Sequence, residues 1–210
     1  MCDLPETATK NTNSWLISNF IDLQGAISVT VNVDFTARQC DFQSLPFCKQ
    51  SFNLHYYPTD NMLASGVQKA TILAGQFTLA GQIKAQHVWS PGQARIYNNA
   101  TVQFSVQRKG LYLGFQDNGG CIALGKVRAS YNYCPAQTFG GVSYDRTSSP
   151  PTGGARRVYG QCGVNSESLH NASSLYMECL SNGSWNRPRY DMTCLCKPGY
   201  QATSQGCQGR

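Results

Sequence analysis

Ten cysteines constrain this 210-residue chain more than any other feature of its sequence. Four are spread from Cys2 to Cys121, and six follow from Cys134 onward. An even set of cysteines in a chain with few charged residues is typical of a disulfide framework, which persists in oxidising compartments. The closest metal-like spacing is Cys194-Leu195-Cys196. It has no second cysteine or histidine pair at zinc-finger distance, so we expect no metal centre and no cofactor.

Three N-glycosylation sequons point to the same compartment; they begin at Asn99, Asn171 and Asn182. The first residues do not have the pattern of a signal peptide, and no apolar run reaches the roughly 18–20 residues that cross a bilayer. We therefore expect an extracellular piece of a single-pass cell-surface protein, with its leader and membrane anchor outside this sequence. This segment is expected to make no membrane contact itself.

The charge pattern argues against a nucleic-acid partner. The formal net charge is +6, and the nearest approach to a basic cluster is Arg156-Arg157, which has no interleaved aromatic residues on which bases could stack. Acidic residues are few, and neither a Gly-x-Ser-x-Gly elbow nor a His-Glu-x-x-His motif occurs, so a hydrolase is disfavoured as well.

Strict alternation of apolar and polar residues dominates the first 134 positions. It is clearest from Ile27 to Phe35 and recurs around Phe52–Tyr56, Val102–Val106, Leu111–Phe115 and Val127–Tyr133. Turn-forming residues separate these runs, as in Asp117-Asn118-Gly119-Gly120. The pattern predicts an all-β fold, an antiparallel jelly-roll sandwich that buries the apolar faces.

The composition changes at Pro135. Residues 135–157 are rich in Gly, Pro, Ser and Thr and are predicted to form a linker or a long loop. Beyond them the cysteine density rises, as expected for a module too small to be stable without covalent bridges. A domain boundary is therefore expected near Cys134.

The cysteine-rich part resembles a sushi (complement-control) module. The similarity rests on Cys134-Pro135, Cys162, Cys179, Gly183-Ser184-Trp185 and Cys194. It implies that Cys134 pairs with Cys179 and Cys162 with Cys194, although spacing alone permits other connectivities. We place this disulfide-rich module at 158–195, with its first cysteine at 134. Residues 196–210 resemble the start of an EGF-like repeat, in which Cys196 and Cys207 could close a small loop.

The front part, residues 1–134, resembles the ligand-binding domain of Eph receptors. One similar window runs from Phe35 to Cys40 and continues from Cys48 to Tyr57, and a second runs from Lys109 through Cys121 to Cys134. The resemblance implies a jelly roll that accepts a protruding loop of an ephrin on an opposing cell, with receptor clustering as a possible consequence. It also implies disulfides between Cys2 and Cys121 and between Cys40 and Cys48.

The same resemblance assigns a binding site. Arg38 matches the family's arginine that meets an acidic ephrin residue, and a guanidinium can grip a carboxylate with two parallel hydrogen bonds. Small side chains are expected to flank it and leave room for an apolar loop; these are Thr36, Cys2, Cys121 and Ala123. Residues Asp3–Asn13 and Val67–Gln82 resemble the family's recognition loops.

Several features depart from the family pattern. The family's domain begins before the position of Cys2, so N-terminal strands are expected outside this sequence, and the Cys40–Cys48 loop is short. No kinase motif occurs, so the chain is expected to be non-catalytic, with any tyrosine kinase domain elsewhere. Two alternatives stay open: a carbohydrate-binding jelly roll, and an adhesive ectodomain without ephrin affinity.

Overall fold

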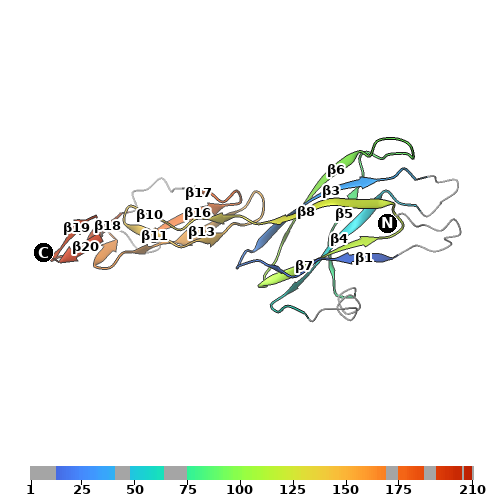
Figure 1. The fold of residues 1–210 in the computed structure, drawn as a ribbon. Helices are drawn as coiled ribbons and strands as arrows, with labels where there is room; N and C mark the ends of the chain where they lie inside the picture. The colour runs from blue at the N-terminus through green and yellow to red at the C-terminus, as the bar shows by residue number, and fades with distance from the viewer. Residues whose placement is uncertain are drawn as a thin grey trace. The chain divides into compact units, whose positions relative to one another are not determined.

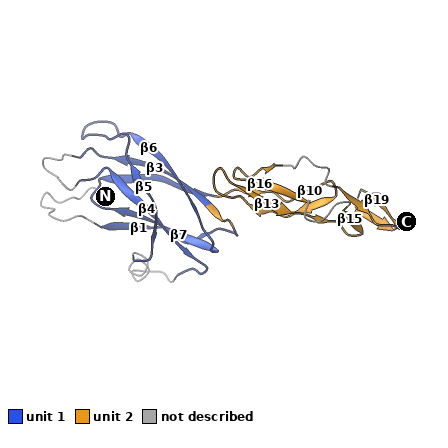
Figure 2. Ribbon diagram, turned by 180° about the vertical axis from the view of Figure 1, so that it is seen from behind, with its two compact units in different colours: residues 1–25, 29–130 blue, residues 26–28, 131–210 orange. Residues whose placement is uncertain are grey.

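The computed structural model describes residues 13–40, 48–63, 75–168, 175–186, 193–204 and 206–209. Every regular element in this part of the chain is a β-strand, and all paired strands run antiparallel (Figure 1). The chain divides into two compact units, Met1–Gly25 with Val29–Ser130 and Ala26–Ser28 with Tyr131–Arg210 (Figure 2). The predicted fold class, an all-β sandwich followed by a disulfide-rich module, is confirmed.

Two antiparallel sheets form the first unit. One has the order β1-β7-β4-β5, with β2 also paired to β7, and the other has the order β6-β3-β8. The strands are β1 (Ser14–Ile17), β2 (Ile21–Asp22), β3 (Ser28–Ala37), β4 (Ser51–Thr59), β5 (Thr78–Lys84), β6 (Tyr97–Ser105), β7 (Gly110–Asp117) and β8 (Ile122–Ser130).

The core of this unit lies between the two sheets. Alternate residues of β3, from Val29 to Ala37, are fully enclosed, as their period of two predicts. Phe35 of β3 meets Phe52 of β4 edge to face, with ring centroids 5.1 Å apart. Burial of each such aromatic or aliphatic side chain contributes about 1.5–3 kcal/mol of favourable transfer free energy.

Strand β7 is buried on both faces, which alternation alone does not predict. Leu111 and Leu113 point into the sandwich, whereas Tyr112 lies on the opposite face and is also fully enclosed. The Tyr112 hydroxyl accepts a hydrogen bond from the Leu63 backbone N–H at 2.9 Å, and its ring packs against Phe20. The loops that flank this sheet therefore cover its outer face at the centre.

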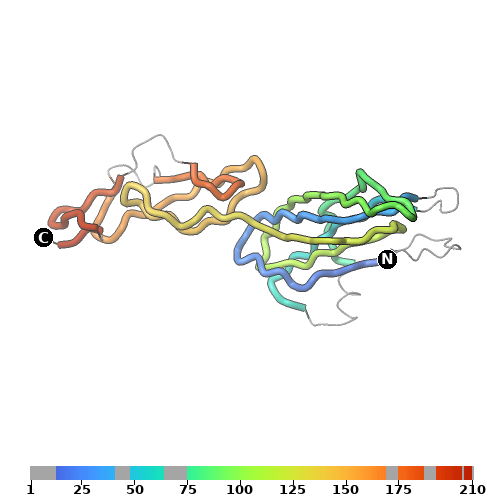
Figure 3. The backbone as a smooth tube through the Cα atoms, turned by 45° about the horizontal axis from the view of Figure 1, so that its top comes forward, coloured from blue at the N-terminus to red at the C-terminus, as the bar shows by residue number. Residues whose placement is uncertain are grey.

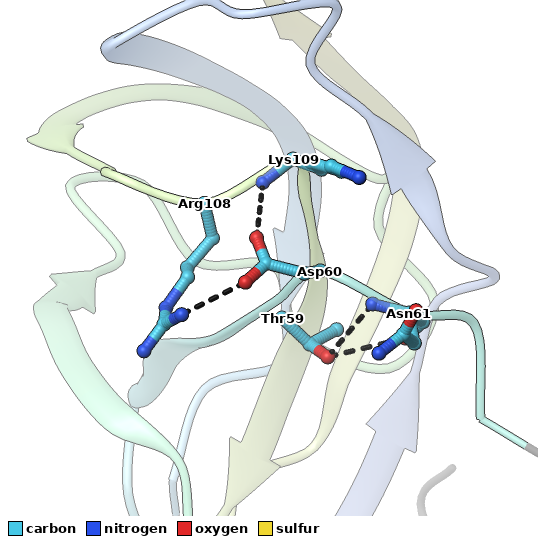
Figure 4. Close-up of polar contacts among 5 residues, drawn as sticks. All are labelled: Thr59, Asp60, Asn61, Arg108 and Lys109. Atoms are coloured by element: carbon cyan, nitrogen blue, oxygen red, sulfur yellow. Dashed lines mark hydrogen bonds and ion pairs between the residues drawn. The ribbon is translucent and has the colours of Figure 1, made fainter.

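An ion pair joins the end of β4 to the start of β7. Asp60 follows β4 directly, and its carboxylate accepts hydrogen bonds from the Arg108 guanidinium and the Lys109 backbone N–H (Figure 4). Among the described residues this is the one ion pair within 4.0 Å. The contact anchors β7, the central strand of its sheet.

The second unit consists of short strands around a small core. Val142, Tyr144, Leu175 and Met177 are buried there, with Trp185 packed against them. Its strands are β9 (Tyr133–Cys134), β10 (Gln137–Phe139), β11 (Val142–Tyr144), β12 (Thr147–Ser148), β13 (Ala155–Tyr159), β14 (Gln161–Cys162), β15 (Ser166–Ser168), β16 (Tyr176–Leu180), β17 (Trp185–Asn186), β18 (Cys194–Cys196), β19 (Tyr200–Thr203) and β20 (Gly206–Gly209).

The segment 135–157, predicted as a linker or long loop, differs from that expectation. It contains β10, β11, β12 and the start of β13, because Val142 and Tyr144 alternate with Ser143 and enter the core. The turn residues that suggested a linker, such as Gly140 and Gly141 with positive φ, reverse the chain between β10 and β11.

Disulfide bonds hold both units. The structure contains Cys40–Cys48 in the first unit and Cys134–Cys179, Cys162–Cys194 and Cys196–Cys207 in the second. These are the pairings that the resemblances implied. Cys121 is disulfide-bonded as well, whereas Cys2, its expected partner, lies outside the described residues.

Candidate ligand-binding site

Arg38 lies where β3 ends, between two other backbone segments. Its own N–H donates to the Cys121 carbonyl at 2.9 Å, and the N–H of Gln39 donates to the Trp89 carbonyl at 2.9 Å. The Trp89 N–H donates in turn to the Ala37 carbonyl at 3.1 Å, which completes a parallel bridge between Arg38 and Trp89. The connection between β5 and β6 therefore lies beside the end of β3 (Figure 3).

A tight turn between β7 and β8 lies on the other side of the Arg38 backbone, next to Cys121. The Asp117 carboxylate accepts hydrogen bonds from the N–H groups of Gly119 and Gly120, and the Gly119 carbonyl accepts the Lys49 N–H at 3.0 Å. Gly119 has φ of +115°, a conformation that favours glycine. Because Lys49 follows Cys48, the Cys40–Cys48 bridge ties the end of β3 to this same turn.

Four of the five predicted site residues are described, and they lie together. Thr36 is the direct cross-strand partner of Ala123, and Cys121 adjoins Arg38 through the backbone bond. Arg38 and Ala123 are exposed, whereas Thr36 is only 4% exposed and Cys121 7%. The fifth residue, Cys2, lies outside the described part of the chain.

The Arg38 side chain has no acidic partner in the described part of the protein, where no carboxylate comes within 4.0 Å of it. An exposed guanidinium whose backbone is held on two sides is well placed to bind a carboxylate of another molecule. Hydrogen bonds within the protein already hold the backbone from which this side chain projects.

An apolar pocket of about 300 Å³ opens near Ala123, which is one of its lining residues. Arg38, Thr36 and Cys121 do not line it. Its walls come from β1, from Phe52 of β4, from the end of β7 and from the start of β8. The β1 side, Ser14–Leu16, carries no local signal in the sequence, since only the pairing of β1 with β7 brings these residues to β8.

Leu16, which lines this pocket, and Val127 of β8 face the sandwich interior by register yet remain exposed. Leu16 pairs with Phe115 and is 55% exposed, and Val127 pairs with Val33 and is 40% exposed. Both lie on strands that end their sheets in the described topology, β1 and β8. Apolar surface is therefore exposed on both of these strands.

Two tryptophans on which a sugar could stack contact other residues of the protein instead. Trp15 packs between His55 and Phe77, with ring centroids at 4.8 and 5.3 Å, and Trp185 donates its indole N–H to the Pro135 carbonyl at 2.7 Å. Within the described ranges no group of three or more His, Cys, Asp or Glu residues is arranged to hold a metal ion.

Other predicted features fall only partly in the described chain. Asn99 and Asn182 are exposed, while Asn171 lies outside the described residues. Of the predicted recognition loops, only Asn13 and residues 75–82 are described. No helix that is long and apolar enough to cross a membrane occurs among the residues that the structure describes.

Comparison of the sequence with known proteins places the chain in a family. The family model "Ephrin receptor ligand binding domain" matches residues 1–134. Ephrin type-B receptor 4b of Danio rerio is 33% identical over 191 residues, which cover 89% of this chain and 19% of that receptor. Ephrin type-A receptor 3 of Danio rerio is 30% identical over 217 residues, which cover 99% of this chain and 21% of that receptor. Ephrin type-A receptor 8 of Mus musculus is 30% identical over 207 residues, or 94% of this chain and 19% of the receptor. The chain thus spans about one fifth of the length of these relatives.

Proposed function

We propose, starting from the fact that this chain belongs to the ephrin receptor ligand binding domain family, that it binds an ephrin-type protein displayed on a neighbouring cell. It would do so as part of the extracellular region of an Eph-like receptor. The activity is recognition rather than catalysis. Contact between two cells would be its setting, with clustering of bound receptors on the cell surface.

The observation that carries this proposal is the exposed guanidinium of Arg38 at the end of β3, which has no acidic partner among the described residues. The hydrogen bonds of Arg38 and Gln39 to Cys121 and Trp89 fix the backbone from which this side chain projects. Because that backbone is already ordered, little conformational entropy is lost there when a carboxylate of the ligand binds. Arg38 would therefore orient an acidic residue of the ligand loop.

Apolar contact would come from the adjacent strands. Ala123 and the exposed Leu16 offer small and apolar surface beside the pocket. A loop that carries an acidic residue next to apolar ones would place its carboxylate on Arg38 and its apolar side chains at the open edge. The polar contact fixes orientation, while the buried apolar area supplies affinity.

Surface plasmon resonance tests the proposal directly. Recombinant ephrin ectodomains are immobilised, and the full chain is compared with Arg38→Ala and with Arg128→Ala as a matched control. Arg128 is exposed on β8 opposite Asn32, roughly 20 Å along the sheet at about 3.3 Å per residue. We expect Arg38→Ala to weaken binding at least ~30-fold, since truncating one partner of a close charge pair costs about 2 kcal/mol or more. Arg128→Ala should bind as the wild type does.

Two results would count against the proposal. If the wild-type chain binds no ephrin ectodomain, the ephrin function is wrong. If it binds but Arg38→Ala binds equally well, the anchor is elsewhere. A glycan array run in parallel tests the carbohydrate-binding alternative, which requires sugar binding without ephrin binding.

A further inference from the structure

A second arginine of the first unit, Arg95, lies on the segment that pairs with Arg38 through Trp89. The Arg95 guanidinium carbon is 5.6 Å from the centre of the Trp89 ring, over the indole face. Trp89 is the bridge partner of Arg38, and paired residues on neighbouring strands carry their side chains on the same face of a sheet. The indole therefore stands beside Arg38 and supports Arg95.

The segment that carries Trp89 and Arg95 is held at both ends. Buried Asn98 accepts the N–H groups of Gln86 and His87 at 2.9 and 2.8 Å and donates to the His87 carbonyl at 2.8 Å. On the other side the Ser90 hydroxyl donates to the Gln39 side chain at 2.7 Å. This network orders the connection on both sides of Arg95, whose own side chain contacts the Trp89 ring.

Among the described residues, no acidic side chain balances the charges of Arg38 and Arg95. Neither Arg38 nor Arg95 has a carboxylate within 4.0 Å there, and the indole N–H of Trp89 has no acceptor among them. Two cationic side chains without an internal counter-charge are typical of a surface whose counter-charge comes from a partner. The cation–π contact with Trp89 helps to hold Arg95 in place.

We propose that Arg95, stacked on Trp89, is a second cationic contact beside Arg38, and that the two arginines together recognise an acidic protein segment that carries more than one carboxylate. This inference rests on the proposed function and names the chemistry of the ligand at its site. A protein segment is favoured over a sulfated polysaccharide because the apolar pocket at Ala123 lies on the same part of the unit, and a polysaccharide would leave it unfilled.

Arg95 is exposed, so its contribution should appear mainly in the association rate and in salt dependence. Arg95→Ala is expected to weaken ephrin binding about 5- to 10-fold, mostly through slower association, and to reduce the slope of affinity against salt concentration. Arg95→Lys should recover only part of this loss, because an ammonium group lacks the planar face that stacks on Trp89. Arg128→Ala, which removes an exposed arginine elsewhere, should change neither quantity.

The surface plasmon resonance experiment separates this inference from the proposed function. If Arg38→Ala weakens ephrin binding while Arg95→Ala leaves both affinity and salt slope unchanged, Arg95 has no role and the proposed function still stands. If Arg95→Ala lowers affinity and Arg95→Lys restores it completely, only charge matters and the stacked geometry is rejected.

A second readout does not depend on ephrins. The full chain is titrated with a triglutamate peptide while the arginine side-chain N–H resonances are followed by NMR, with assignments from Arg38→Lys and Arg95→Lys. The resonances of Arg38 and Arg95 should move together, and that of Arg128 should stay in place. Movement of Arg38 alone, or of neither, overturns the inference.

Two combined outcomes complete the test. Movement of both resonances in a chain that binds no ephrin supports the cationic pair and rejects the proposed function. Movement with a heparin oligosaccharide but not with triglutamate overturns the inference in favour of a sulfated polysaccharide.

Discussion

The guanidinium of Arg108 donates a hydrogen bond to the carboxylate of Asp60 at 2.8 Å, across a gap of 48 residues in the chain. The Lys109 backbone N–H donates to the other carboxylate oxygen at 3.0 Å. The pKa of the Asp60 carboxyl is therefore lowered from its ordinary value of 3.8, first by the Lys109 N–H and then by Arg108.

This shift predicts an acid-dependent contribution to stability. A carboxyl group with a lower pKa in the folded state stabilises the fold above its unfolded pKa, and the effect is lost as pH falls through the folded pKa. Asp60→Asn should therefore unfold at lower urea concentration than the wild type at neutral pH, and the difference should shrink as pH falls below the ordinary carboxyl pKa and through the lower pKa of the folded state. The effect should be small, since both side chains are exposed to solvent. Asp145→Asn, an exposed charge removal in the second unit, is the control, and an equal effect there would contradict a specific role for Asp60.

Gly114 of β7 should not tolerate a side chain. A Cβ there would lie 2.9 Å from the Phe77 ring and 3.0 Å from the Trp15 ring, closer than normal contacts. We expect Gly114→Ala to destabilise the protein by about 1–3 kcal/mol through overpacking, measured by urea unfolding. Gly81→Ala is the matched control, because its Cβ would meet Val102 at 3.5 Å, an ordinary contact. Equal stability of the two variants would show that the Phe77 and Trp15 rings move aside at no measurable cost in stability.

The disulfide between Cys134 and Cys179 should be essential for the second unit. It closes a span of 45 residues around a core of few side chains, and the chain-entropy account gives such a bridge about 4 kcal/mol. The double variant Cys134→Ala/Cys179→Ala should therefore become sensitive to limited proteolysis within residues 131–210. Removing Cys40–Cys48, which spans 8 residues, should cost less, about 2.5 kcal/mol, and leave the second unit protected. Full protease resistance of the first variant would refute this account.

The side-chain amides of Asn99 and Asn182, in the two described sequons, make different hydrogen bonds. At Asn182, in the turn between β16 and β17, the side-chain oxygen accepts both the N–H and the hydroxyl of Ser184, at 3.0 and 2.7 Å, which directs the amide nitrogen away from the turn. At Asn99, in β6, the amide nitrogen donates to Asp34 at 2.6 Å, so a glycan there would disturb the sheet surface.

We therefore expect higher glycan occupancy at Asn182 than at Asn99 when the chain is secreted from eukaryotic cells. Glycopeptide mass spectrometry measures both sites, with Asn182→Gln and Asn99→Gln as reciprocal controls. Higher occupancy at Asn99 would show that hydrogen bonding in the folded state does not determine which sequon is glycosylated more.

Much of the fold is predictable from sequence because it depends on local pattern. The alternation from Ile27 to Phe35 identifies the inner face of β3, and Asp117-Asn118-Gly119-Gly120 identifies the turn before β8. Local pattern fails between Pro135 and Arg157, where short strands with few apolar residues have the same composition as a linker. Their pairing depends on strands further along the chain, such as β14 and β16.

Sequence alone determined the class of this protein. The number and spacing of its cysteines and the alternation of apolar and polar residues specify an all-β chain with a disulfide-bonded second part. Only the tertiary structure decided what surrounds Arg38, because its neighbours Trp89 and Cys121 lie 51 and 83 positions further along the chain. Strand pairing between distant segments is set by packing of the whole sandwich, and no local pattern records which residues it brings side by side.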